Sequence, residues 1–224
     1  MSVVGVDGCK DGWIAVVLRD DEVSTFFLER IDMLGDVVTD VSVIAIDIPI
    51  GLLSQGLRKA DVEGRKELGR RQSTLFMVPI REALEAATHE EATRISKARS
   101  GVGISRQSFS LKSKIFEVER WLDDALCPVY EVHPELSFKQ MTDSVVDSSK
   151  KTWAGMMIRR HALLREGINL DTASREVADR AAVDDMLDAG AAAWSAKRID
   201  EGTARSIPQA PEASSRGRAI AIWV

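Results

Sequence analysis

Cysteine, histidine and long apolar runs are scarce in this chain of 224 residues. Its two cysteines, Cys9 and Cys127, lie far apart and lack Cys-x-x-Cys spacing, which argues against a disulfide framework and against a zinc site. No stretch approaches the roughly 20 apolar residues that a membrane span needs. The N-terminal residues lack the basic and apolar regions of a signal peptide. We therefore expect a cytoplasmic protein that has no membrane partner.

Several nucleotide-binding and catalytic motifs are also missing. The chain has no GxxxxGK[ST] loop, and no GxGxxG segment opens a helix after a strand. The three histidines do not cluster, and neither a GxSxG elbow nor a Ser/His/Asp pattern occurs. These absences argue against a P-loop ATPase, a dehydrogenase and a serine hydrolase. The formal net charge of −5 argues against a surface that coats nucleic acid as a whole.

Hydrophobic patterning predicts one mixed α/β domain over residues 1–224, in which helices cover a sheet. Short β-branched runs predict strands at Val3–Val6, Trp13–Leu18, Val23–Leu28, Val43–Ile48 and Val129–Val132. Residues 57–126 are helical and charged, which predicts a helical insertion before the last of these strands, with a Ser/Gly-rich break at Ser100–Ser110. We expect further helices near 31–39, 135–141, 151–165 and 177–198, a flexible loop at Pro208–Arg218, and a closing strand or packed tail at Ala219–Val224.

Acidic residues stand at the ends of buried strands, where a carboxylate is unfavourable unless it is hydrogen-bonded, paired or bound to a cation. Asp7 and Asp47 each end such a strand, and Glu131 lies on a third. A later Ala-rich helix adds Asp185 and Asp188 on one face. Crowded like charges favour a bound cation, and oxygen ligands without His or Cys favour Mg²⁺ or Mn²⁺. The residues predicted to be catalytic are Asp7, Asp47, Glu131, Asp185 and Asp188.

Of these acids, we expect Asp7, Asp47, Glu131 and Asp185 to bind the metal. Whether Asp184, Asp185 or Asp188 contacts it is open at this point. Any single aspartate is about as well explained by an ordinary structural role, such as pairing of Asp184 or Asp185 with Arg180 or Lys151.

Basic residues are concentrated in two stretches of the insertion. Residues 92–116 contain six Lys or Arg and no acid, and residues 58–71 form a mixed cluster. Arginine and lysine in such stretches favour contacts with phosphate. The predicted substrate-binding residues are Arg58, Arg65, Arg71, Lys112 and Lys114. The alternatives are a solvated helix face and an ordinary bridge between Arg58 and Asp61.

Four segments together resemble a known family: Gly5–Trp13 (GVDGCKDGW), Ile46–Gly51 (IDIPIG), Tyr130–Glu135 (YEVHPE) and Asp185–Ala189 (DMLDA). They resemble domain-of-unknown-function family 429 (DUF429), a predicted nuclease family of the ribonuclease H-like superfamily. The resemblance implies a mixed five-stranded sheet, an antiparallel meander followed by parallel strands, with helices on both faces. It places Asp7 on the first strand, Asp47 at the end of the fourth and Glu131 on the fifth. Asp185 stands where many resolvase-like members have His.

The function that these residues and the resemblance imply is metal-dependent hydrolysis of nucleic acid phosphodiester bonds, with Mg²⁺ or Mn²⁺ as cofactor and nucleic acid as partner. One alternative is an ATP-binding phosphotransferase of related architecture, whose Asp7–Lys10 turn would hold phosphates. Another is a non-catalytic binding or regulatory protein. His133, which follows Glu131 closely, is either a proton carrier, an outer partner of the metal ligands or a structural residue.

Overall fold

A computed structural model describes residues 1–224. Strands β1 (Ser2–Cys9), β2 (Gly12–Arg19) and β3 (Glu22–Leu28) form an antiparallel meander. Strands β4 (Val41–Ile46) and β5 (Val129–Glu131) then add in parallel on the other side of β1, giving the order β3-β2-β1-β4-β5. This mixed five-stranded sheet confirms the predicted fold class and is consistent with a ribonuclease H-like fold.

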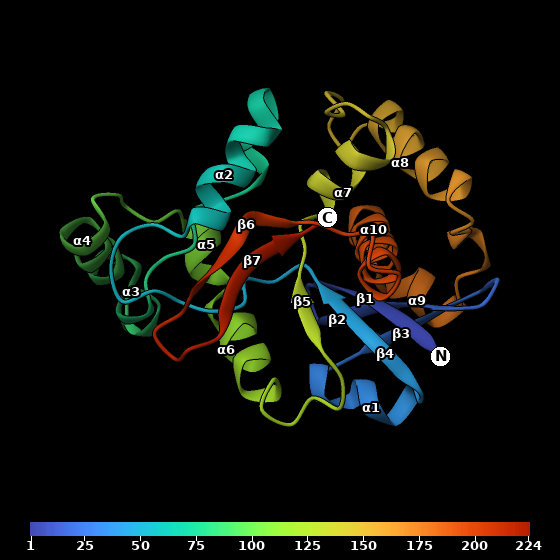
Figure 1. The fold of residues 1–224 in the computed structure, drawn as a ribbon, viewed down its shortest axis with the longest axis horizontal. Helices are drawn as coiled ribbons and strands as arrows, with labels where there is room; N and C mark the ends of the chain where they lie inside the picture. The colour runs from blue at the N-terminus through green and yellow to red at the C-terminus, as the bar shows by residue number, and fades with distance from the viewer.

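The remaining elements cover this sheet and extend beyond it (Figure 1). A short helix α1 (Leu34–Val37) connects β3 to β4, and the segment between β4 and β5 carries α2 (Lys59–Leu68), a 3-10 turn (Gly69–Thr74), α3 (Arg81–Glu85), α4 (His89–Ser100), α5 (Arg106–Ser110) and α6 (Lys112–Trp121). After β5 come α7 (Pro134–Met141), α8 (Trp153–Arg165), α9 (Arg175–Arg180), α10 (Val183–Asp200) and a hairpin of β6 (Ser206–Ala213) and β7 (Ala219–Trp223). None of the helices has both the length and the apolar character of a membrane span.

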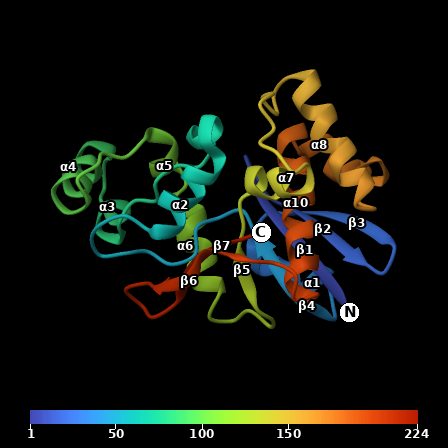
Figure 2. The ribbon, with the colours of Figure 1, turned by 45° about the horizontal axis from the view of Figure 1, so that its top comes forward.

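The two faces of the sheet are buried in different hydrophobic clusters because successive side chains alternate across a strand. Val3 of β1 joins a cluster with α10, whereas Val4 and Val6 join one with α1 and α6. Helix α10 packs along β1, β4 and β2 (Figure 2). A Cβ at Gly5 would lie 1.9 Å from the backbone nitrogen of Ala193, so only glycine permits this close approach. The contact places the first turns of α10 beside the end of β1.

Three local predictions are corrected by the structure. Most of the expected loop at Pro208–Arg218 is strand β6, whose hairpin buries Ile207 and Ile220 in a small core with α2 and α7. The expected helix at 177–198 is two helices, α9 and α10, with Ala181 and Ala182 between them. The expected break at Ser100–Ser110 contains α5, which Ser105 caps by accepting a hydrogen bond from the Ser108 amide. The segment Ala219–Val224 does form the closing strand β7.

Candidate active site

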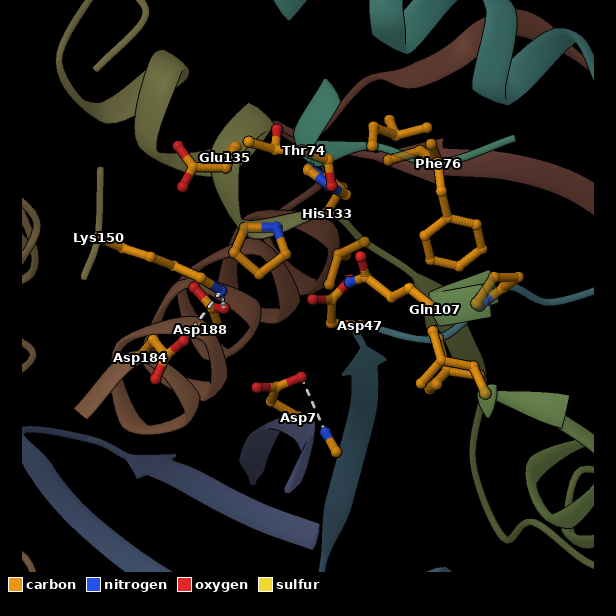
Figure 3. Close-up of a pocket in the computed structure, with 18 of the residues that line it drawn as sticks. Asp7, Asp47, Thr74, Phe76, Gln107, His133, Glu135, Lys150, Asp184 and Asp188 are labelled. Atoms are coloured by element: carbon orange, nitrogen blue, oxygen red, sulfur yellow. Dashed lines mark hydrogen bonds and ion pairs between the residues drawn. The ribbon is translucent and has the colours of Figure 1, made fainter. Parts of the chain in front are cut away.

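A cavity of about 440 Å³ opens at the carboxyl ends of β1 and β4. The sheet edge and the first turns of α10 form one side, and the insertion between β4 and β5 forms the other. Figure 3 shows the acidic side chains of Asp7, Asp47, Asp184 and Asp188 reaching into it. Ligands in parallel α/β sheets usually bind at this end of the strands.

Asp7 and Asp47 are neighbours because β1 and β4 run in parallel with Val6 opposite Ile46. The Asp47 amide donates a hydrogen bond of 2.9 Å to the Val6 carbonyl, which fixes that register at the strand ends. Strand alternation places both aspartates on the α10 side of the sheet. Asp7 is buried, and its carboxylate accepts one hydrogen bond, from the Gly8 amide at 2.8 Å.

Asp188 comes from α10 and is 2 % exposed. Its Oδ2 accepts a hydrogen bond from the ammonium group of Lys150, and Lys150 Nζ also lies 4.0 Å from Asp184 Oδ2 (Figure 3). The other oxygen of Asp188, Oδ1, is buried without a hydrogen-bond partner. A buried carboxylate oxygen without a donor is unfavourable, so this atom is free to bind a further ligand.

The aspartate cluster (Asp7, Asp47 and Asp188) is electrostatically unbalanced. Burial raises the pKa of Asp47 to about 7, and burial, opposed by Lys150, raises that of Asp188 to about 7. Burial and the neighbouring Asp47 raise the pKa of Asp7 well above its ordinary value. Although burial opposes the charge on Lys150, the attraction of Asp188 raises its pKa. One ammonium group therefore faces three carboxylates that resist simultaneous ionisation.

The donor set fits a hard divalent cation. Several carboxylates line this end of the cavity, and Mg²⁺ and Mn²⁺ prefer oxygen ligands of this kind. No three acidic, His or Cys side chains converge closely enough to bind one ion together as they stand. Lys150 supplies the positive charge among them, so binding of an ion would require this flexible side chain to move aside or to share the site.

Glu131 lies apart from the aspartate cluster, for a reason of register. It pairs with Ile46, whose side chain is buried on the α1 and α6 side of the sheet, so Glu131 points to that side too. There Arg58 Nη2 donates to both of its oxygens at 2.6 Å, and the Ile50 amide donates at 2.7 Å. Its oxygens are thus satisfied by the protein, and we leave Glu131 out of the proposed metal ligands.

Arg58 is not placed to bind substrate either, because only 1 % of its side chain is exposed. Besides Glu131 it contacts Asp61 at 3.6 Å, and the second oxygen of Asp61 accepts a hydrogen bond of 2.8 Å from the Val78 amide. The bridge to Asp61, which the sequence left as an alternative, is therefore present. We call Arg58, Asp61 and Glu131 the buried ion network.

Comparison with known proteins places the chain in a family. A family model described as a protein of unknown function, DUF429, matches residues 5–213. The chain belongs to the DUF429 family. No curated protein and no solved structure matches it. The match spans the aspartate cluster and the whole insertion, so both are parts of the DUF429 domain.

The other four basic residues of this DUF429 protein that were predicted to bind substrate do not all lie at the cavity. Arg71 lines the cavity. The Arg65 guanidinium donates to the Leu75 carbonyl, and Lys112 Nζ donates to the Ala86 carbonyl at 3.0 Å. Lys114 Nζ donates to the Gly12 carbonyl at 2.6 Å and lies over the Trp13 ring. Of the five predicted substrate-binding residues, only Arg71 lines the cavity.

Two further functional candidates line the DUF429 cavity. Lys150 was not predicted, because it stands in a polar loop without a motif and reaches the acids only through the tertiary fold. His133 Nε2 lies 3.3 Å from the Thr74 carbonyl, and its Nδ1 is buried without a partner. A carbonyl accepts only, so Nε2 carries the proton and Nδ1 is the free acceptor. Burial lowers the pKa of His133 and keeps the ring neutral.

Proposed function

We propose that this DUF429 protein is a metal-dependent phosphodiesterase that acts on nucleic acid. The observation that carries the proposal is the crowding of Asp7, Asp47 and Asp188 at the sheet edge with Lys150 as their single close counter-ion. Such an arrangement destabilises the fold unless it binds a cation, and strongly perturbed carboxylates in a cavity are a signature of functional sites.

In this proposal Asp7, Asp47 and Asp188 hold Mg²⁺ or Mn²⁺, with Asp185 beside them at the cavity wall. When bound, the ion supplies Lewis-acid activation of the phosphate and of the attacking water. Side chains of the protein supply the other positive charges near the substrate. Lys150 forms an ion pair with Asp188 and offsets part of the negative charge of the cluster. The cavity residues Arg71 and Lys151 are placed to bind phosphate oxygens.

His133 supplies a proton acceptor in the same cavity. Its neutral ring is held by the Thr74 carbonyl and leaves Nδ1 free. Within this proposal Nδ1 accepts the proton that the attacking water loses, and the oxygen that leaves the phosphorus takes up a proton in turn. His133 immediately precedes α7, and of the three histidines it is the one that lines the cavity.

The geometry favours this function over an ATP-binding phosphotransferase. A phosphate-binding turn after β1 would need free backbone N–H groups. Here the Gly8 amide already donates to Asp7, and β1 and β2 are joined by a tight turn at Lys10 and Asp11. A non-catalytic protein remains the outcome if metal binds and no nucleic acid is hydrolysed.

A nuclease assay with purified protein tests the proposal. Single- and double-stranded DNA and RNA would be incubated with Mg²⁺ or Mn²⁺ and with EDTA. We expect metal-dependent cleavage that falls at least about 100-fold in Asp7→Asn and in Asp47→Asn, because each removes a metal ligand. Asp36→Asn, an exposed aspartate on α1, is the matched control. Equal activity in Asp47→Asn and wild type would contradict the proposed site.

A further inference from the structure

The cavity also has a wall on which apolar and amide groups face the aspartate cluster. Phe76, Pro49 and Leu111 add apolar surface to the cavity lining, and Gln107 adds an amide. Figure 3 shows the Phe76 ring and the Gln107 side chain pointing into the cavity from the insertion side, across from the carboxylates. Phe76 is partly buried and Gln107 is exposed, so both present surface to a ligand. Binding of a metal ion by the aspartate cluster would not require an aromatic ring and an amide in the same cavity.

Three hydrogen bonds from other elements hold the backbone of the segment that carries Phe76. Arg65 donates to the Leu75 carbonyl, and Asp61 accepts from the Val78 amide at 2.8 Å. His133 contacts the Thr74 carbonyl on the preceding turn. One member of the buried ion network, Asp61, therefore contacts the segment two residues after Phe76. Fixing the backbone around an aromatic residue before a ligand arrives reduces the entropy lost on binding.

We propose that this wall binds one nucleoside unit of single-stranded nucleic acid, with the base on the Phe76 ring and the neighbouring phosphate directed to the aspartate cluster. The inference rests on the proposed function and specifies its substrate. Base–aromatic stacking accepts any base because every base has a π-face. The Gln107 amide, with one acceptor and two donors, can bond the edge of the stacked base.

The size and charge of the cavity support the same ligand. Its volume of about 440 Å³ is that of a small-molecule site, which suits one nucleotide. A base in an intact duplex reaches such a cavity only after it is flipped out, at the expense of pairing and stacking. The cations that line the cavity, Arg71, Lys150 and Lys151, are suited to the phosphates on either side of that base.

Binding measurements without hydrolysis test the inference. The probes are a fluorescein-labelled single-stranded pentanucleotide, a duplex of the same sequence, AMP and inorganic phosphate, each titrated with protein in Ca²⁺. We expect the single strand to bind more tightly than the duplex. We expect Phe76→Ala to lose roughly 5- to 150-fold in affinity for the strand and for AMP, the equivalent of one stacked base, and nothing for inorganic phosphate.

Two variants separate stacking from a general loss of structure. Phe26→Ala is the matched control, because Phe26 is also partly buried against the same hydrophobic cluster but lies outside the cavity. Phe76→Trp keeps a stacking surface and should retain the affinity. Equal binding by Phe76→Ala and wild type, equal losses in Phe76→Ala and Phe26→Ala, or equal binding of duplex and strand would overturn the inference.

Failure of the inference is distinguishable from failure of the proposed function. Mn²⁺ titration by calorimetry, without nucleic acid, reports on the aspartate cluster alone. If Mn²⁺ binds and Phe76 makes no difference to nucleotide affinity, the nucleoside site is wrong and the metal site stands. If Mn²⁺ does not bind and the strand still depends on Phe76, the nucleoside site stands and the metal site is wrong.

Discussion

Two groups of acidic residues line the same cavity and differ in how their charge is balanced. In the buried ion network, Arg58 lies between Glu131 and Asp61, and a backbone amide donates a hydrogen bond to each of the two carboxylates. In the aspartate cluster, three carboxylates share Lys150, and an oxygen of Asp188 has no donor. Burial of an acid is therefore not in itself a sign of function. The number of carboxylates per cation, which is two in the network and three in the cluster, is the more informative feature.

The largest expected effect comes from breaking the balanced group. Arg58→Met leaves Glu131 and Asp61 buried without their cation, and removal of one partner from a buried pair destabilises by about 3–5 kcal/mol. Urea unfolding measures the free energy of unfolding. Arg30→Met, which removes an exposed arginine paired with Asp32, should change it by less than about 1 kcal/mol. Similar losses in the two variants would show that the network does not stabilise the fold.

A smaller effect is expected from removing the cation of the unbalanced group. Lys150→Met takes away the counter-ion of Asp188, so the metal-free protein should lose about 1–3 kcal/mol of stability. Saturating Mn²⁺ should then raise the melting temperature more in this variant than in wild type, because the ion replaces the missing charge. Thermal unfolding with Mn²⁺ and with EDTA measures both shifts. An identical Mn²⁺ shift in the two proteins would count against competition between Lys150 and the ion.

The smallest effect is a pH dependence of stability that arises from the raised pKa values of the aspartate cluster. In the metal-free protein the pKa values of Asp47 and Asp188 are about 7, against about 3.9 for an aspartate in an unfolded chain. Between these values the folded state binds more protons, so its free energy of unfolding falls as the pH rises from about 4 to about 7. Asp47→Asn removes one such group and should stabilise the metal-free protein by about 1 kcal/mol at pH 8.

Urea unfolding in EDTA at about pH 5 and about pH 8 checks this expectation. The pH dependence should be shallower in Asp47→Asn than in wild type. A variant that is less stable than wild type at pH 8, with an unchanged pH dependence, would show that Asp47 is a structural residue rather than a strained ligand.

The fold was predictable to the extent that it depends on local patterns. β-branched runs predicted the five strands of the sheet, and aspartates near the carboxyl ends of two of them, Asp7 within β1 and Asp47 after β4, indicated where the cavity lies. Strand β6 was missed because Pro208 and Pro211 interrupt the strand pattern, while its burial comes from a core formed with α2 and α7.

The site was less predictable because it depends on contacts between distant segments. Glu131 shares strand character with the aspartates, but its pairing with Ile46 turns it to the other face of the sheet, and a change of one residue in register would reverse this. Lys150 is 38 residues from Asp188 in the sequence and stands in a loop. No periodicity or motif connects them.

The most direct test of the central claim is calorimetric titration of Mn²⁺ into wild type, Asp47→Asn and Glu131→Gln, with each variant first shown to be folded by circular dichroism. We predict binding to wild type, loss of binding in Asp47→Asn, and retained binding in Glu131→Gln, since Glu131 belongs to the balanced network. Absence of binding to wild type, or binding that Glu131→Gln abolishes and Asp47→Asn leaves intact, would contradict the assignment of the metal site to the aspartate cluster.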